Sequence, residues 1–405
     1  MILRVFSLGF LGFLLLLSNG CHKKAPEIVI GTAGPMTGDQ SKQGGDIVNG
    51  VRLAVDEWNE KGGINGIKIR VEIGDDQHDP KQAVSVANKM VNMGIVGMVG
   101  HFNSSASIPA SSVYHSAGIP MITPGSTNPR LTDQGFKTVF RVCGRDDQQG
   151  KVAAQFAVQS FHAKRIAILH DKTTYGQGLS EEFQKAVLSF KTTVGAENLL
   201  PLPEIVSFDG ITQGDKDFRS IMTTVKGKNP DLFFFGGIFP EGGLLVKQAK
   251  EMGMTAPMIS GDGVFDPKFI EIAGPVSEGT LLTFAPDPEN IPSAKNFLQK
   301  YKAKHGEGLA PYAIYAYDAT NILLTALSQV GGHGMRDGNK VSEAIRNLKY
   351  DGALGRTEFD AKGDVKVSPY IVWVTKGGKF KEHWNPLQGA LSSVGATHAS
   401  PLPTS

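Results

Sequence analysis

Segments with strand-like and helix-like patterns alternate along the chain in two successive series. In the first series, apolar residues from Val51 to Trp58 recur at i, i+3, i+4 and i+7, the spacing of one helix face. Residues 67–73 then alternate isoleucine or valine with polar residues, as a half-exposed strand does. The pattern restarts in the second series, where the strand candidates are residues 165–169, 205–208, 232–235 and 258–259. Because strands that alternate with helices form parallel sheets, we predict an α/β fold with two doubly wound parallel-sheet lobes.

Length, charge and motifs narrow the class of protein further. A single core would be strained at 405 residues, so two domains are expected. The 41 basic and 39 acidic side chains leave a net charge of +2, which gives little support to a nucleic-acid partner. Two cysteines, Cys21 and Cys143, are too few for a zinc cluster or a disulfide framework. The chain has no HExxH, GxSxG or P-loop motif, and residues 75–79 are typical of a solvated acidic turn. We therefore predict no catalytic residue, no metal and no cofactor.

The N-terminal residues are typical of an export signal. Residues 1–20 contain Arg4 and an apolar run of 13 residues, which is too short to span a bilayer. The run ends at Ser-Asn-Gly-Cys21, which is similar to a bacterial lipoprotein cleavage box, although Ser18 stands where leucine is usual. Lipidation of Cys21 is favoured over plain secretion, with residues 21–26 as a tether to the membrane. No later segment has 18 consecutive apolar residues, so we expect the body of the protein to be soluble and exported.

Seven short blocks, in order and correctly spaced, resemble one family. The blocks are Gly34–Gly38, Asp56–Gly66, Asp75–Ala83, Ile122–Pro124, Asp147–Gly150, His170–Gly176 and Asp360–Asp364. Across residues 27–385 the chain resembles the periplasmic branched-chain amino-acid-binding proteins of ABC transporters, the Leu/Ile/Val-binding family. Each block alone is a weak match, but their shared order and spacing are specific.

The resemblance implies a type I periplasmic-binding-protein fold, in which three chain crossings form a hinge between the lobes. The N-terminal lobe is expected to comprise residues 27–145 and 286–354, and the C-terminal lobe residues 146–285 and 355–386. Residues 387–405 carry no Asp, Glu, Lys or Arg and are expected to form a disordered tail. The two lobes would close on a small molecule in the cleft between them.

The loop from Gly100 to Ser105 is a candidate site for the carboxylate of an amino acid. It leads from a predicted strand into a predicted helix, where free backbone N–H groups and a hydroxyl can bind an anion. Ser104 matches the carboxylate-binding serine of the family. On its position alone, a helix-capping role for Ser104 and Ser105 is as well supported.

The Pro-Gly segment at residues 123–127 is expected to form a second wall of the site. The backbones of Gly125, Ser126 and Thr127 would supply N–H and C=O groups, and the Thr127 hydroxyl can donate to a carboxylate and accept from an ammonium group. An ordinary Pro-Gly turn would also explain this segment.

The C-terminal lobe supplies the remaining predicted ligand contacts. Asp262 lies where many relatives have glutamate, so the resemblance implies that it accepts the ligand ammonium. Tyr175 matches a family tyrosine that covers the ligand. An aspartate in a glycine-rich turn and a loop tyrosine packed on its own lobe are the structural alternatives. The possible side-chain pocket, also implied by the resemblance, comprises Gln43, Phe102, Ile238, Ala310 and Tyr312.

The predicted function is that of an extracytoplasmic solute-binding protein, monomeric and not an enzyme. It would bind a free amino acid, with a branched-chain amino acid as first guess, and deliver it to the membrane permease of an ABC importer. Gln43 and Ile238 lie where branched-chain binders often have tyrosine, so a polar or aromatic amino acid stays open as ligand. A sensor, or a binder of short amides with the same fold, is the alternative.

Overall fold

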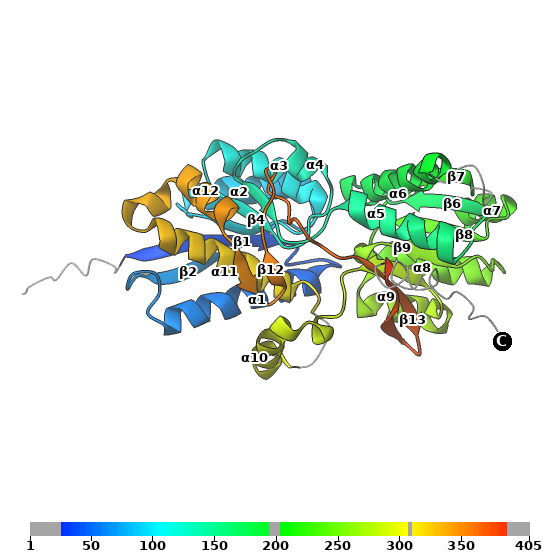
Figure 1. The fold of residues 1–405 in the computed structure, drawn as a ribbon. Helices are drawn as coiled ribbons and strands as arrows, with labels where there is room; N and C mark the ends of the chain where they lie inside the picture. The colour runs from blue at the N-terminus through cyan, green and yellow to red at the C-terminus, as the bar shows by residue number, and fades with distance from the viewer. Residues whose placement is uncertain (1–25, 194–202, 307–309, 387–405) are drawn as a thin grey trace, which may run out of the picture.

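The structure, a computed structural model, describes residues 26–193, 203–306 and 310–386. Its elements form two lobes, each built on one sheet with helices on both faces (Figure 1). The predicted signal peptide, the Cys21 anchor, its tether as far as residue 25 and the tail 387–405 lie outside the described residues.

The sheet of the N-terminal lobe has five parallel strands in the order β2-β1-β3-β4-β5. The strands are β1 Glu27–Gly34, β2 Lys68–Asp75, β3 Met98–Gly100, β4 Met121–Thr123 and β5 Val139–Arg141. The helices are α1 Ser41–Glu60, α2 Pro80–Asn92, α3 Ser104–Ser116, α4 Arg130–Asp133, α10 Lys295–His305, α11 Ala313–Val330 and α12 Gly338–Asn347. Helices α2 and α3 cover one face of the sheet, and α1 and α11 cover the other (Figure 1).

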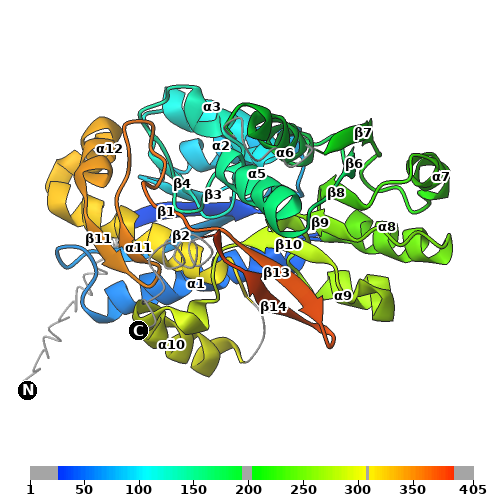
Figure 2. The same ribbon diagram turned by 45° about the vertical axis from the view of Figure 1, so that its right-hand side comes forward.

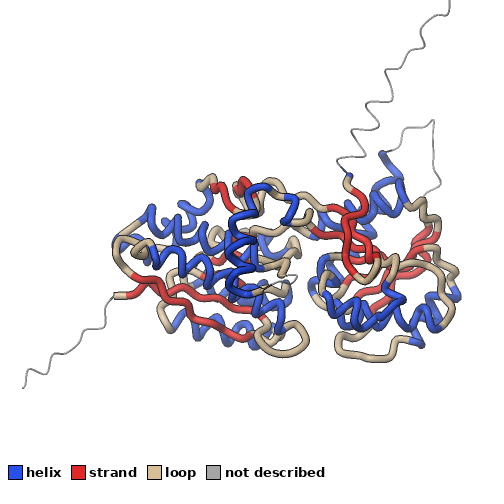
Figure 3. The backbone as a smooth tube through the Cα atoms, turned by 90° about the horizontal axis from the view of Figure 1, so that it is seen from below, coloured by secondary structure: helices blue, strands red, loops and turns tan. Residues whose placement is uncertain are grey.

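The sheet of the C-terminal lobe has seven strands in the order β14-β13-β10-β9-β8-β6-β7. Five are parallel: β6 Arg165–His170, β7 Glu204–Gly210, β8 Leu232–Gly236, β9 Met258–Ser260 and β10 Leu281–Phe284. An antiparallel hairpin completes the edge, β13 Ile371–Lys376 and β14 Lys379–Trp384 (Figure 2). The helices are α5 Asp146–Gln155, α6 Thr174–Thr193, α7 Arg219–Gly227, α8 Phe239–Glu251 and α9 Pro267–Ala273. Both series of predicted strands are therefore confirmed, and Figure 3 shows helices around the strands of each lobe.

The chain crosses between the lobes after β5, after β10 and before β13. The predicted boundary at residue 355 is wrong for the third crossing. Strand β12, Gly355–Thr357, pairs with β11, Tyr350–Gly352, and Asp364 bonds to Arg141 of β5 at 2.6 Å. The segment stays on the N-terminal lobe because that buried guanidinium needs a carboxylate partner, so the crossing follows residue 364. The rest of the predicted lobe division stays a prediction.

The hairpin formed by β11 and β12 is tied to helix α11 by one buried acid, Asp318. Its carboxylate accepts the backbone N–H groups of Ala353 at 3.0 Å and Leu354 at 2.7 Å. Burial raises the pKa of Asp318 to about 6, even though the two N–H bonds favour the ionised form.

A pH-dependent contribution to stability follows from Asp318. Because its folded pKa lies above its unfolded pKa, the folded state binds the proton more tightly, and stability falls as pH rises from about 4 to about 6. The effect of this one group is up to about 3 kcal/mol. We expect the free energy of unfolding of the wild type, relative to that of Asp318→Asn, to decrease over this pH range in urea denaturation. Parallel pH profiles for the two proteins would contradict the assignment.

Candidate functional site

A small cavity lies between the lobes, where loops that follow strands of both sheets meet. Such loops converge because parallel strands end at the same edge of a sheet. The volume of the cavity that is open to the centre of a water molecule is about 30 Å³. This small volume suits a compact ligand. Its lining residues are Gln40, Gln43, Phe102, Asn103, Ser104, Gly125, Tyr175, Ile238, Asp262, Gly263, Phe265 and Tyr312.

Most of the predicted site residues meet at this cavity, and three do not line it. Ser126 is fully buried and its hydroxyl is turned into the N-terminal lobe, where it bonds to Ser107 at 2.5 Å and to the Phe102 carbonyl at 2.7 Å. Thr127 is buried and is absent from the lining. Ala310 lines a separate depression, together with Phe297 and Tyr301. Tyr312, which lies two residues later and directly before α11, does line the cavity. Ala310 is therefore removed from the predicted pocket.

Ser104 is the first residue of helix α3, which begins directly after strand β3. The capping position is Asn103, whose carbonyl accepts the N–H groups of Ala106 and Ser107. The Ser104 hydroxyl instead accepts the Asn128 N–H at 3.2 Å, so the capping alternative for Ser104 is wrong. Its hydrogen can be donated into the cavity, next to the positive end of a helix.

The loop after β4 is shaped by the hydroxyl of Thr123. That hydroxyl donates to the His101 carbonyl at 2.6 Å and accepts the N–H groups of Gly125 at 3.2 Å and Ser126 at 3.0 Å. A Cβ at Gly125 would lie 2.4 Å from the Phe102 ring, so glycine is required where this ring packs against the loop. The segment is a turn, as the alternative held, and the turn places Gly125 at the cavity.

Arg141, fully buried at the end of β5, supports the same loop from behind. Its guanidinium donates to the carbonyls of Ser126 at 2.7 Å and Asn128 at 3.0 Å, on either side of Thr127. Asp364 neutralises it at 2.6 Å. The sequence offered one indication of this role, since an arginine at the end of a short Val-Phe-Arg strand needs an acidic partner when buried.

Asp262, which follows β9, is the acidic centre of the cavity and is 6% exposed. Its carboxylate accepts the hydroxyls of Tyr175 at 2.8 Å and Tyr312 at 3.1 Å, so tyrosines from both lobes hold it. Burial raises the pKa of Asp262, and the hydrogen bond from Tyr175 partly offsets the effect.

Asp146, at the start of α5, is a second buried acid that sequence reasoning missed. It is fully buried, and its carboxylate makes no hydrogen bond of good geometry within the described residues. Burial and the nearby charge of Asp262 raise the pKa of Asp146 well above its usual range, and the Thr127 hydroxyl and Arg141 partly offset this. The raised pKa favours the neutral form of Asp146 beside Asp262, and a ligand cation at the two acids would favour the ionised form of both.

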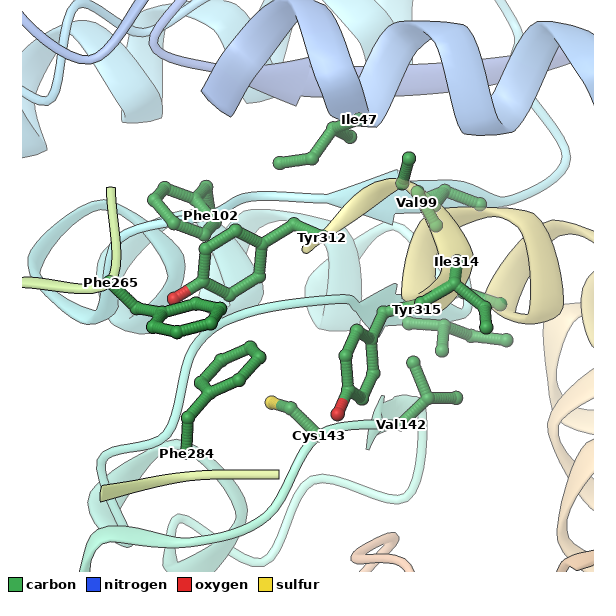
Figure 4. Close-up of a cluster of buried hydrophobic side chains, with 14 of the residues drawn as sticks. Ile47, Val99, Phe102, Val142, Cys143, Phe265, Phe284, Tyr312, Ile314 and Tyr315 are labelled. Atoms are coloured by element: carbon green, nitrogen blue, oxygen red, sulfur yellow. The ribbon is translucent and has the colours of Figure 1, made fainter. Parts of the chain in front are cut away.

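Two further polar contacts near the cavity join the two lobes. The Gln43 side chain, on α1, donates to Asp266 of the C-terminal lobe at 2.6 Å. Asn128 donates to the Thr174 carbonyl at 2.8 Å. Phe102 and Tyr312 pack edge to face with centroids 4.6 Å apart, and Phe265 and Phe284 of the C-terminal lobe lie beside them (Figure 4). The lobes are thus in contact around the cavity.

Other chemistry-bearing groups in the described part of the chain do not form a second centre. Among residues 26–193, 203–306 and 310–386, no three His, Cys, Asp or Glu side chains cluster as metal ligands do. Asp75 instead accepts the Met36 N–H at 2.9 Å and the Thr37 hydroxyl at 2.6 Å, which ties the end of β2 to the loop after β1. Asp76 is fully buried and bonds to His101 at 2.7 Å, so the predicted solvated acidic turn is wrong at this residue. Cys143 is a buried thiol, and burial raises its pKa to about 12. No helix in these ranges is long and apolar enough to cross a membrane.

Comparison with known proteins places the chain in a family. A family model described as periplasmic binding protein matches residues 27–379. The amino acid binding protein of Pseudomonas aeruginosa is 41% identical over 358 residues, which cover 87% of this chain and 91% of that relative. Leu/Ile/Val-binding protein homolog 1 of Brucella suis is 39% identical over 353 residues, with the same two coverages, 87% and 91%.

Solved structures agree with this assignment. The leucine-binding protein of Thermotoga maritima superposes with a TM-score of 0.80 at 30% identity, covering 89% of this chain and 99% of that one. The isoleucine complex of a branched-chain amino acid transporter substrate-binding protein from Streptococcus pneumoniae gives a TM-score of 0.77 at 27% identity, covering 89% and 100%. These relatives and neighbours are substrate-binding proteins, not enzymes. The chain therefore belongs to the periplasmic binding protein family, as an extracytoplasmic substrate-binding protein with the type I fold and the Leu/Ile/Val-binding proteins among its relatives.

Proposed function

We propose that the protein closes its two lobes on one free amino acid and delivers it to the permease of an ABC importer. The observation that carries this proposal is the pairing of opposite chemistries across one cavity. The N-terminal lobe presents a serine hydroxyl at a helix start, and the C-terminal lobe presents a buried carboxylate. An amino-acid zwitterion has the two charges that these groups stabilise.

In this proposal each site residue has a defined role. Ser104 and the α3 N–H groups bind the ligand carboxylate, together with the Thr127 hydroxyl, which lacks a well-formed hydrogen bond among the described residues. The N–H of Gly125 is already bound to Thr123, so Gly125 contributes its carbonyl to the ammonium group. Asp262 is the counter-ion, and Tyr175 covers the ligand while bonding to Asp262.

Relatives guide the ligand class and the partner. The Brucella suis relative is named for binding leucine, isoleucine and valine, and the two solved structures are a leucine-binding protein and an isoleucine complex. These names make a branched-chain amino acid the first candidate ligand for this chain. The Streptococcus pneumoniae protein is named as the substrate-binding protein of a transporter, which supports a membrane permease as partner. Export through residues 1–20, anchoring to the membrane through a lipid on Cys21, and a monomeric state belong to the same proposal.

Thr127→Val is expected to separate binding from stability. The substitution replaces a buried hydroxyl that makes no well-formed hydrogen bond in the described structure, so the free energy of unfolding should stay within about 1 kcal/mol of the wild type. Amino-acid affinity should fall about tenfold, which corresponds to ~1.4 kcal/mol. The measurement is thermal unfolding of protein refolded to remove ligand, against all amino acids, short amides and small carboxylates.

A matched control is Thr375→Val in strand β13. Thr375 is also fully buried, and its hydroxyl likewise lacks a bond among the described residues. It lies in a strand of the C-terminal sheet, whereas Thr127 lies two residues after the cavity residue Gly125. This variant should leave amino-acid affinity unchanged. A panel in which no amino acid raises the melting temperature would remove the proposed roles of Ser104 and Asp262 and favour amide binding or sensing.

A further inference from the structure

Two residues that line the cavity each carry a side-chain oxygen that is buried without a hydrogen bond from the described residues. The oxygens are Oε1 of Gln43 and Oδ1 of Asn103, whose side chains are 5% and 8% exposed. Both residues belong to the N-terminal lobe, on α1 and directly before α3. An amide oxygen has two acceptor positions, so each can accept a hydrogen bond from a bound molecule.

The nitrogen ends of both amides are already engaged. Nε2 of Gln43 donates to the Asp266 carboxylate at 2.6 Å, and Nδ2 of Asn103 donates to Oε1 of Gln40 at 2.8 Å. The Asp266 carboxylate also accepts the Lys268 N–H at 2.8 Å through its other oxygen, which holds it in place as an acceptor. Gln43 must therefore keep its nitrogen toward Asp266 and its oxygen away from it.

Gln43 and Asn103 belong to the part of the cavity wall that the N-terminal lobe supplies. Gln40 immediately precedes α1 and Gln43 lies one helical turn later, so the two side chains project from neighbouring positions. Because Gln40 is bonded to Asn103, the amides of Gln43 and Asn103 are grouped there. The C-terminal lobe contributes the apolar side chains of Ile238 and Phe265 to the lining, together with Tyr175, Asp262 and Gly263.

We propose that this cavity selects a small neutral amino acid whose side chain donates hydrogen bonds, with a carboxamide side chain preferred because its two N–H groups match two acceptors. The inference rests on the proposed function, since it assumes that the zwitterion is bound at Ser104 and Asp262, and it replaces the branched-chain side chain suggested by the relatives with a hydrogen-bonding one. An aliphatic side chain would leave both amide oxygens buried and unpaired, which is unfavourable relative to their hydration before closure. A hydroxyl side chain would satisfy one of the two.

The test compares amino acids of nearly equal shape by titration calorimetry. Asparagine should bind at least tenfold more tightly than leucine, and threonine more tightly than valine, because each pair differs mainly in hydrogen-bonding groups. In Gln43→Leu the asparagine preference should fall below threefold. Asn103→Leu is the second variant and leaves Asp266 with its Gln43 partner, so the selectivity test survives if Gln43→Leu fails to fold. Gln134→Leu, whose amide bonds to Ser111 and Leu131 outside the cavity, should retain wild-type selectivity.

The outcomes distinguish this inference from the proposed function. Tighter binding of leucine or valine than of asparagine or threonine would overturn the selectivity proposal and leave amino-acid binding intact. Tightest binding of lysine or arginine would also overturn it, because the ligand side chain would then be cationic. Binding of no amino acid would overturn the proposed function, and the selectivity proposal with it.

Discussion

Asp262→Ala should weaken amino-acid binding by thirtyfold or more. Asp262 is 6% exposed and is the acid that lines the cavity, so a ligand ammonium enclosed by the lobes would lose its counter-ion. Truncating one partner of a buried, hydrogen-bonded charge pair costs about 2–5 kcal/mol in affinity. Calorimetric titration of the refolded protein with its best ligand measures the change directly.

Two further variants separate charge from shape. Asp262→Asn retains the side-chain volume of aspartate, and its amide oxygen can still accept one tyrosine hydroxyl. A loss of amino-acid affinity close to that of Asp262→Ala would show that the charge of Asp262 matters. Asp318→Asn removes another buried acid, on α11 and away from the cavity, and should leave affinity unchanged. Wild-type affinity in Asp262→Ala would exclude Asp262 from the ligand site.

Arg141→Met is expected to destabilise the protein by about 3–5 kcal/mol, the effect of breaking a buried ion pair by removing one partner. The substitution leaves the carboxylate of Asp364 without Arg141 and frees the carbonyls of Ser126 and Asn128. Arg141→Lys should recover little, because a point charge cannot reproduce the planar guanidinium that reaches the carboxylate and two carbonyls. Urea denaturation of the ligand-free protein provides the measurement.

A surface arginine supplies the control for Arg141. Arg165, at the start of β6, pairs with Glu204 at 2.5 Å, but its side chain is 43% exposed. Exposed ion pairs contribute about 0–1 kcal/mol, so Arg165→Met should have a much smaller effect. If Arg141→Met and Arg165→Met lowered the free energy of unfolding equally, the Arg141–Asp364 ion pair would be no stronger than an exposed one. Arg141 would then not organise the 125–128 loop.

The fold could be predicted because its determinants are local. The helical spacing of apolar residues between Val51 and Trp58 lies within helix α1. The alternation of apolar and polar residues in 67–73 corresponds to strand β2. Strand ends identify the loops that can meet at a sheet edge, and Ser104, Gly125 and Asp262 were found on such loops. The third crossing could not be placed this way, because the position of Asp364 depends on Arg141, which is 223 residues away.

At the site, too, the sequence identifies candidate residues, but contacts between distant parts of the chain decide their roles. Sequence identified Gln43 as a pocket residue, but its bond to Asp266, also 223 residues distant, decides which end of the amide faces the cavity. Asp146 is the first residue of helix α5, and only its burial near Asp262 makes it a candidate electrostatic partner of the ligand.

The sequence by itself determined the α/β class, the two-lobed repeat, the family resemblance and the loops that carry the site. Residue spacing and local turn chemistry are enough for these, since each depends on neighbours within a few turns or strands. Only the tertiary structure decided the buried polar network, including the Arg141–Asp364 pair and the amide oxygens of Gln43 and Asn103, which lack a partner among the described residues. Whether a polar group is paired depends on desolvation and on partners brought together by folding, and neither can be read from spacing along the chain.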